Sequence, residues 1–183
     1  MNMITPNLDA DIIPLKSAAG IDIGLSFDEF LKYSKHKLVN DEEYNNPSST
    51  KGLWYVVHHK GISSVGKEFD SYSCRWNNDV ILRFDGTPKK TLYGIIVSGD
   101  YKGSLFDELR IGDRLDKLLY KYDLDFYADG HFLVYKDNPD DAVPIEIGTD
   151  YLASYEDVPN QIIQLFYVTM PLEEQKKHGI TWD

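Results

Sequence analysis

Histidine and cysteine are the residue types of this chain best suited to metal binding or nucleophilic catalysis. The 183 residues include one cysteine, Cys74, and five histidines. The histidines are His36, His58, His59, His131 and His178. None is paired at the i, i+4 spacing that places two ligands on one helix face. His58 and His59 are adjacent in a predicted strand, so their side chains point to opposite faces. Cys74 has no CxxC partner, which favours a small buried residue over a nucleophile. The sequence therefore predicts no metal site and no catalytic thiol.

Phosphate-binding and hydrolase motifs are also missing. Neither GxxxxGK[ST] nor GxGxxG occurs, and there is no GxSxG elbow. Single glycines, Gly24 and Gly112, open two predicted turns into helices, and the turn geometry itself accounts for them. We therefore expect no cofactor and no catalytic residue, which makes an enzyme the minority interpretation.

Acidic side chains form two clusters that are better suited to binding a partner. The first lies in a polar segment, 40–51, which has neither helical nor strand periodicity and contains Pro47, so a loop is expected. The second lies in a short acidic turn, 137–141. Carboxylates there can occupy the positions at which a basic protein receives phosphates, while a tyrosine anchors the centre of the contact. The predicted partner-binding residues are Asp41, Glu42, Glu43, Tyr44, Asp137, Asp140 and Asp141.

Composition supports the same interpretation. Lys and Arg total 19 against 30 Asp and Glu, which gives a net charge of −11. Such a chain repels nucleic acid and accelerates association with a basic protein. Hydrophobic residues make up 42% and aromatic residues 13%, enough for a packed core. No apolar run approaches the ~18 residues of a membrane span, and the start has no signal-peptide pattern. These features predict a soluble cytoplasmic protein.

An internal sequence repeat indicates which secondary-structure elements position these residues. The segment 21–31 reads IDIGLSFDEFL, and 109–119 reads LRIGDRLDKLL, so the glycines and the following acidic and apolar positions coincide. Each copy predicts a short strand, a glycine turn and an amphipathic helix. Ser26 with Glu29 fits a capping box, in which the hydroxyl accepts from the third helical N–H and the carboxylate reaches back.

Strand-like runs follow each predicted helix. They are rich in β-branched and aromatic residues and are separated by Gly, Asn, Asp or Pro. An Asp129-Gly130 pair predicts a tight hairpin turn with positive φ angles. The runs are 54–59, 72–76, 80–84 and 92–97 in the first half, and 124–127, 131–135, 143–147 and 162–168 in the second. We therefore predict an α+β fold of two tandem repeats, each an amphipathic helix packed on an antiparallel sheet. The repeats span 12–100 and 101–170 within a single domain, 1–183.

This arrangement resembles the tandem repeats of β-lactamase-inhibitory-protein-like folds. The stretch 12–24, IIPLKSAAGIDIG, together with IGDRLDKL and IGTDY (147–151), also resembles small proteins encoded beside bacterial polymorphic toxins. Those are immunity proteins, which bind toxins delivered by contact-dependent inhibition, Rhs or type VI secretion systems. The resemblance covers about residues 12–168, and it implies occlusion of a toxin active site with no catalytic residue.

The function expected from the sequence is thus binding and neutralising a cognate, basic toxin domain, as a monomer or in a 1:1 complex, with no nucleic acid or membrane partner. Two alternatives stay open. The first is an enzyme that uses a cleft between the repeats, which a deep pocket with converging titratable groups would favour. The second is an assembly module that pairs an exposed strand edge with a partner sheet.

Overall fold

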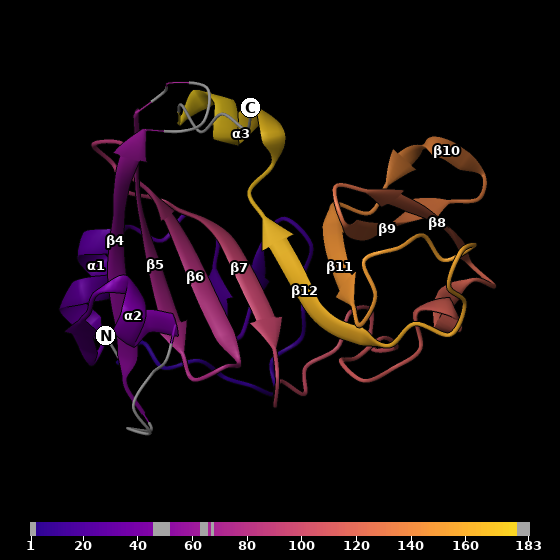
Figure 1. Ribbon diagram of the computed structural model, residues 1–183, viewed down its shortest axis with the longest axis horizontal. Coiled ribbons are helices and arrows are strands. Elements are labelled where there is room, and N and C mark those ends of the chain that lie inside the picture. Colours follow the sequence, from indigo (N-terminus) through magenta and orange to yellow (C-terminus); the bar gives the residue numbers. More distant parts are fainter. Residues whose placement is uncertain (1–2, 46–51, 63–65, 67, 179–183) are drawn as a thin grey trace.

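The computed structural model describes residues 3–45, 52–62, 66 and 68–178, and one twisted ten-stranded sheet dominates this part of the chain (Figure 1). Neighbouring strands are antiparallel except for the pair β3 and β4. The order across the sheet is β10-β9-β11-β12-β7-β6-β5-β4-β3, and β8 also pairs with β9. These strands are β3 (His36–Leu38), β4 (Trp54–Ile62), β5 (Glu68–Trp76), β6 (Val80–Asp85), β7 (Leu92–Ser98), β8 (Tyr122–Tyr127), β9 (Gly130–Tyr135), β10 (Asn138–Ala142), β11 (Ile145–Thr149) and β12 (Ile163–Thr169).

Helices contribute little, and the predicted α+β fold of two helix-plus-sheet repeats is wrong: the structure is mostly β. A separate two-stranded sheet joins β1 (Ser17–Ala18) to β2 (Ile21–Asp22). The helical elements are α1 (Phe27–Tyr33), α2 (Asp41–Asn45), the 3-10 turn η1 (Leu115–Leu118) and α3 (Leu172–Lys177). Of the two predicted amphipathic helices, only the first forms as an α-helix.

The second predicted helix is replaced by η1, a single 3-10 turn. Arg114 stands where Ser26 stands in the first half, and it makes no side-chain cap hydrogen bond. A short helix is marginal without packing along its length. Helix α1 runs further, and Ser26 caps it as expected, accepting a 3.2 Å hydrogen bond from Glu29 N. The same sequence pattern therefore gives a helix in one half and a single 3-10 turn in the other.

What the two halves do share is the glycine turn. Gly24 has φ +92° and donates to Leu92 O at 2.8 Å, while Gly112 has φ +86° and donates to Ile163 O at 2.9 Å. Glycine adopts these positive φ angles without the strain of a Cβ. Leu92 and Ile163 begin β7 and β12, which are antiparallel neighbours in the sheet. The two halves therefore meet in the middle of the sheet. In each half, the glycine turn is hydrogen-bonded to the first residue of the last strand.

The core lies on one face of the sheet. Alternate residues of the central strands point to this side and are fully buried, including Leu82, Ile95 and Phe166. On this face α1 contributes Phe30, whose ring centroid lies 5.4 Å from that of Trp54. Most of the remaining cover is irregular chain from the N-terminal segment and from residues 101–118. A sheet with one buried face needs such a cover, and here loops supply most of it.

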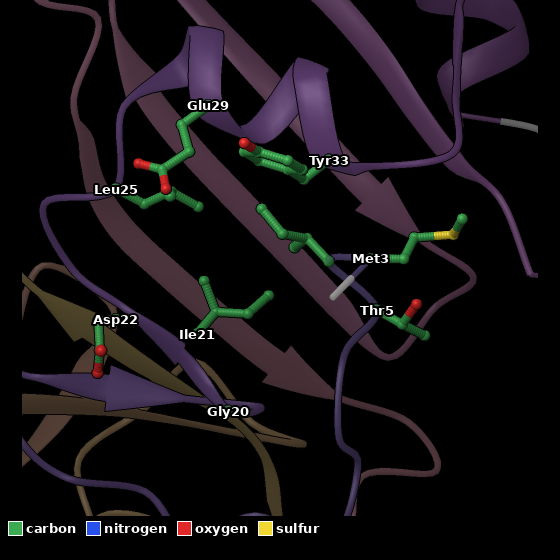
Figure 2. Close-up of a pocket in the computed structure, with 9 residues that line it drawn as sticks. Met3, Thr5, Gly20, Ile21, Asp22, Leu25, Glu29 and Tyr33 are labelled. Atoms are coloured by element: carbon green, nitrogen blue, oxygen red, sulfur yellow. The ribbon is translucent and has the colours of Figure 1, made fainter. Parts of the chain in front are cut away.

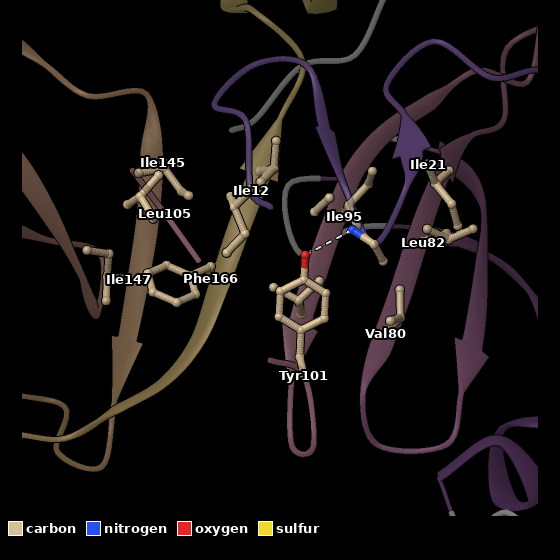
Figure 3. Packing of buried hydrophobic residues seen from close by; sticks show 14 of the residues in the cluster. Ile12, Ile21, Val80, Leu82, Ile95, Tyr101, Leu105, Ile145, Ile147 and Phe166 are labelled. Carbon is tan, nitrogen blue, oxygen red and sulfur yellow. Dashed lines mark hydrogen bonds between the residues drawn. The ribbon is translucent and has the colours of Figure 1, made fainter. Parts of the chain in front are cut away.

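Tyr101 fastens the two covering segments together. Its hydroxyl donates to Ala10 O and accepts from Ala19 N at 3.1 Å. Next to it, Ile12 N donates to Ser104 O at 2.8 Å. Figure 3 shows the Tyr101 ring between the apolar side chains of β11 and β12 and those of β6 and β7. The N-terminal segment is therefore an integral layer of the fold.

The predicted hairpin after β8 forms, but its turn is one residue earlier than expected. Ala128 and Asp129 have the positive φ angles, at 49° and 67°, and Tyr127 pairs with Gly130. Gly130 is the first residue of β9. A Cβ at Gly130 would lie 2.5 Å from Glu146 Cγ, so glycine is required there for close approach of a neighbouring side chain.

Candidate functional site

The second face of the sheet is the most extensive candidate site. Figure 1 shows α2 in front of β4 and the N-terminal chain behind β6 and β7, while no described element lies in front of β6, β7 and β12. Side chains that alternate with the core residues point to this side. We call this surface the open face. Its residues are Ile81, Arg83, Tyr93, Gly94, Ile96, Gly130, Glu146, Gly148, Leu165 and Tyr167.

Glycines in the strands let large side chains lie close to the backbone on the open face. A Cβ at Gly94 would lie 2.6 Å from the Tyr167 hydroxyl, and one at Gly148 would lie 2.7 Å from Leu165 Cγ. Glycine within a strand marks this kind of close approach. The tyrosine and the leucine therefore lie across the backbone of the adjacent strands instead of standing upright. The result is a broad surface with apolar and aromatic groups spread along it.

Charged groups are set into this apolar surface. The Arg83 guanidinium carbon lies 5.1 Å from the centroid of the Tyr167 ring, a cation–π contact. Half-buried Glu146 pairs in register with Tyr167, and burial raises the pKa of its carboxyl group despite the positive charge of Arg83. Burial also raises the pKa of Tyr93. These groups are held in a partly desolvated setting, where a partner's charge or hydrogen bond has a larger effect than in water.

The Tyr167 hydroxyl is unsatisfied. Tyr167 is 9% exposed, and its hydroxyl makes no hydrogen bond of good geometry among the described residues, although the Arg83 side chain approaches it closely enough to oppose the rise in its pKa. Burial raises the pKa of Tyr167 to about 12. A buried hydroxyl without a hydrogen bond costs about 1–3 kcal/mol. At the centre of the open face this hydroxyl can therefore donate or accept a hydrogen bond.

The first predicted acidic cluster lies at one end of the sheet. The expected loop contains α2, and Asn40 Oδ1 accepts from Glu43 N at 2.9 Å as its cap. Residues 46–51 of that loop lie outside the described part. Glu43 pairs with Lys37, and Asp41 Oδ1 lies 3.5 Å from His59 Nδ1. Glu42 is exposed on the same helix.

Tyr44, predicted as the anchor of that cluster, is buried instead. It is 8% exposed and packs against Tyr55 and Val57 of β4. Arg75 Nη1 donates to Tyr44 O at 3.3 Å. Burial raises the pKa of Tyr44 to about 12. Tyr44 therefore holds α2 on the sheet, and the carboxylates of α2 are the groups that remain at the surface.

The second predicted cluster lies at the opposite end. Asp137 and Asp141 are exposed at and within β10, the strand at the far end of the sheet from β4 and α2. The Asp140 side chain lies outside the part of the molecule that the structure describes. The structure thus does not bring the two clusters together. It places them on either side of the open face, which sequence reasoning had not identified as a site.

Groups with catalytic potential are scattered. Burial raises the pKa of the Cys74 thiol well above its ordinary value. His131 is 1% exposed, and burial lowers its pKa, while its Nε2 lies 3.0 Å from Gln161 Oε1. Within residues 3–45, 52–62, 66 and 68–178, no three His, Cys, Asp or Glu side chains gather as a metal site. Nor does any helix of this described part reach the length and apolarity needed to cross a membrane.

The raised pKa values of Tyr44 and Tyr167 predict that the protein loses stability at alkaline pH. Their folded pKa of about 12 exceeds the ordinary value of 10.0, so the folded state holds these protons more tightly. The contribution of the two protonated hydroxyls to the stability of the fold is complete below pH 10, and it is lost as the pH rises towards 12. We expect the free energy of unfolding to fall over this window, by about 2 kcal/mol per tyrosine.

Urea unfolding across the same pH window measures this loss. Tyr167→Phe should remove about half of it, because the phenylalanine has no proton to lose. The matched control is Tyr127→Phe, at a tyrosine that is 74% exposed and should leave the pH dependence as it is. Equal behaviour of the two variants would contradict a shift caused by burial.

Comparison with protein families, with curated proteins and with solved structures gives no match to this chain.

Proposed function

We propose that this protein is an immunity protein: a cytoplasmic, stoichiometric inhibitor that binds a cognate toxin domain and covers its active site without turning over a substrate. The observation that carries the proposal is the open face, an uncovered, partly desolvated surface with Arg83, Tyr167 and Glu146 at its centre. Tyrosine and arginine dominate the binding energy of protein interfaces. The sequence resemblance to immunity proteins supports the same class of function.

The dimensions of the open face suit a macromolecule. Four strands, β6, β7, β12 and β11, lie side by side, and strands in a sheet are about 4.8 Å apart. With β5 and β9 on either side, the surface is roughly 24 Å wide. A standard protein interface covers about 800 Å² on each partner, and a surface this wide supplies its centre. A small molecule would instead be enclosed by a concave pocket.

Charge gives the proposed partner its chemistry. The acidic ends of the sheet form a polar rim on two sides of the open face, with Asp41, Glu42 and Glu43 at one end and Asp137 and Asp141 at the other. This is the usual anatomy of an interface. The whole chain has a net charge of −11, so its electrostatic field attracts a basic protein and speeds its association. We therefore propose a basic toxin domain in a 1:1 complex.

The direct test is co-expression with the toxin domain encoded by the neighbouring open reading frame. Cells that produce the toxin domain alone should stop growing, and cells that also produce this protein should grow. Purified together, the two chains should elute as a 1:1 complex, and the toxin activity should fall in proportion to the inhibitor added. Failure to rescue growth, with no complex at micromolar concentration, would refute the proposal.

Reversing the charge of Asp41, Glu42 and Glu43 to lysine should slow association. The triple variant removes part of the field that steers a basic partner, so its association rate should fall about tenfold at low salt. The dependence of that rate on ionic strength should become weaker, while dissociation changes little. Stopped-flow fluorescence at two salt concentrations measures both rates. Unchanged association at low salt would exclude α2 from the rim of the interface.

A further inference from the structure

A cavity beside α1, on the covered side of the sheet, is separate from the open face. Its volume is about 370 Å³, within the range of small-molecule sites. The walls come from the N-terminal chain, the turn into β2 and one side of α1 (Figure 2). The lining residues are Met3, Ile4, Thr5, Gly20, Ile21, Asp22, Leu25, Glu29 and Tyr33.

One side of the cavity is apolar and firmly held. Ile4 N donates to Tyr33 O at 2.7 Å, and Trp54 Nε1 donates to Ile4 O at 3.0 Å, so the N-terminal chain is fixed against α1 and β4. Ile21 is only 6% exposed. Leu25 adds a further aliphatic surface. These side chains form a preorganised wall suited to an alkyl chain, because an apolar group gains free energy on leaving water.

The other side carries unpaired negative charge. Glu29 and Tyr33 are four residues apart on α1 and so share one helix face. Figure 2 shows the Glu29 carboxylate beside Leu25, with the Tyr33 hydroxyl on the same side of the cavity. The reciprocal half of the predicted capping box is not among the hydrogen bonds of the described residues, so this carboxylate faces the cavity and not the backbone of Ser26.

No cation of the described chain neutralises these groups. Asp22 and Glu29 form no ion pair within residues 3–45, 52–62, 66 and 68–178. Lys32 Nζ does lie near, 4.9 Å from the centroid of the Tyr33 ring, but it engages the ring and not the carboxylates. The cavity thus joins an aliphatic wall to the Glu29 carboxylate and the Tyr33 hydroxyl, both of which accept hydrogen bonds, while the Asp22 carboxylate points away from them (Figure 2).

We propose that this cavity binds an alkylammonium group. Its carbon chain lies against Ile4, Ile21 and Leu25, and its ammonium donates to the Glu29 carboxylate, with the Tyr33 hydroxyl as a further acceptor. An ammonium has three donors and an aliphatic stem, which matches both sides of the cavity. The same chemistry is present in a free primary amine and in the side chain of a lysine on another protein. This proposal is independent of the function proposed above.

Titration of the intact protein with n-hexylamine tests the assignment. Isothermal calorimetry should give an affinity at neutral pH about tenfold higher than that for 1-hexanol, which has the same chain without the charge. In ¹H–¹⁵N spectra the amide signals of Ile4, Ile21 and Tyr33 should shift. Equal affinity for hexanol, or shifts confined to other regions, would overturn the proposal. A peptide with one lysine, used as a competitor, separates the two sources: displacement of hexylamine assigns the site to a lysine side chain, and no displacement assigns it to a free amine.

Variants on α1 supply the matched comparison. Glu29→Gln removes the charge but keeps the shape, and Ser26 still accepts from the backbone N–H of residue 29, so the fold is retained; affinity for hexylamine should fall about tenfold. Asp28→Asn makes the same change at the neighbouring exposed position and should alter the affinity less than about twofold. Urea unfolding of both variants confirms that they are folded. Equal losses of affinity in the two variants, or none in Glu29→Gln, would show that the cavity carboxylate holds no ammonium.

Discussion

Replacing Arg83 by alanine should weaken binding of the toxin domain by about 30-fold or more, the loss expected of an interface hot spot worth at least about 2 kcal/mol. Arg83 is half-buried at the centre of the open face, beside the Tyr167 ring. Its guanidinium presents five donors in a rigid fork to a partner. Truncation removes these donors and also exposes the ring to water. The effect should appear mainly in the dissociation rate, because a central contact governs how long a complex lasts.

The control for this variant is Arg110→Ala. It makes the same chemical change at an exposed arginine in the second glycine turn, away from the open face, and should change affinity less than about twofold. Tyr167→Phe completes the set, since it removes only the unsatisfied hydroxyl. If that hydroxyl bonds to the partner, the variant loses about tenfold in affinity, in line with one hydrogen bond. Surface plasmon resonance on the purified toxin domain measures all three. Wild-type binding by Arg83→Ala would remove the open face from the interface.

The strands were predictable from the sequence because their chemistry is local. Runs such as 80–84 and 92–97 are dense in β-branched and aromatic residues, and the structure has β6 and β7 there. The Ser26 cap was also local and is present. The helix expected after Gly112 has Arg114 in place of the capping serine, with no side-chain cap hydrogen bond, and only a 3-10 turn forms there.

The open face could not be predicted from the sequence in the same way. Arg83 and Tyr167 lie in strands whose other residues build the core, and a sequence does not show which face is covered. Here much of the cover is irregular chain, from the N-terminal segment and from residues 101–118, whose course over the sheet a sequence pattern does not show. A partial signal did exist in Gly94 and Gly148, because glycine inside a strand indicates that another group approaches closely. The two acidic clusters could be recognised in the sequence as runs of Asp and Glu. Only the strand order showed that they lie at opposite ends of the sheet.

The contact between the N-terminal segment and residue 103 leads to a second prediction, which concerns the stability of the fold. Gly103→Ala should destabilise the fold by about 3 kcal/mol or more, the range of severe core changes. A Cβ at Gly103 would lie 1.8 Å from Ala10 O, and no backbone contact that short is tolerated. To relieve it, the N-terminal chain must move, and Tyr101 then loses its bond to Ala10 O. The buried side chains beneath that chain, Ile12 among them, would be exposed to water.

Gly24→Ala is the matched control, because Gly24 has a positive φ of 92° but nothing within 4 Å of the added Cβ. Its cost should be only the backbone strain, about 1 kcal/mol. Urea unfolding gives the free energies, and limited proteolysis reports whether the N-terminal segment has detached. We expect early cleavage near Ala10 in Gly103→Ala and an intact segment in Gly24→Ala. If both variants lose the same small amount of stability, the N-terminal segment is not held at Gly103, and the buried face of the sheet must depend on the cover supplied by α1 and residues 105–118.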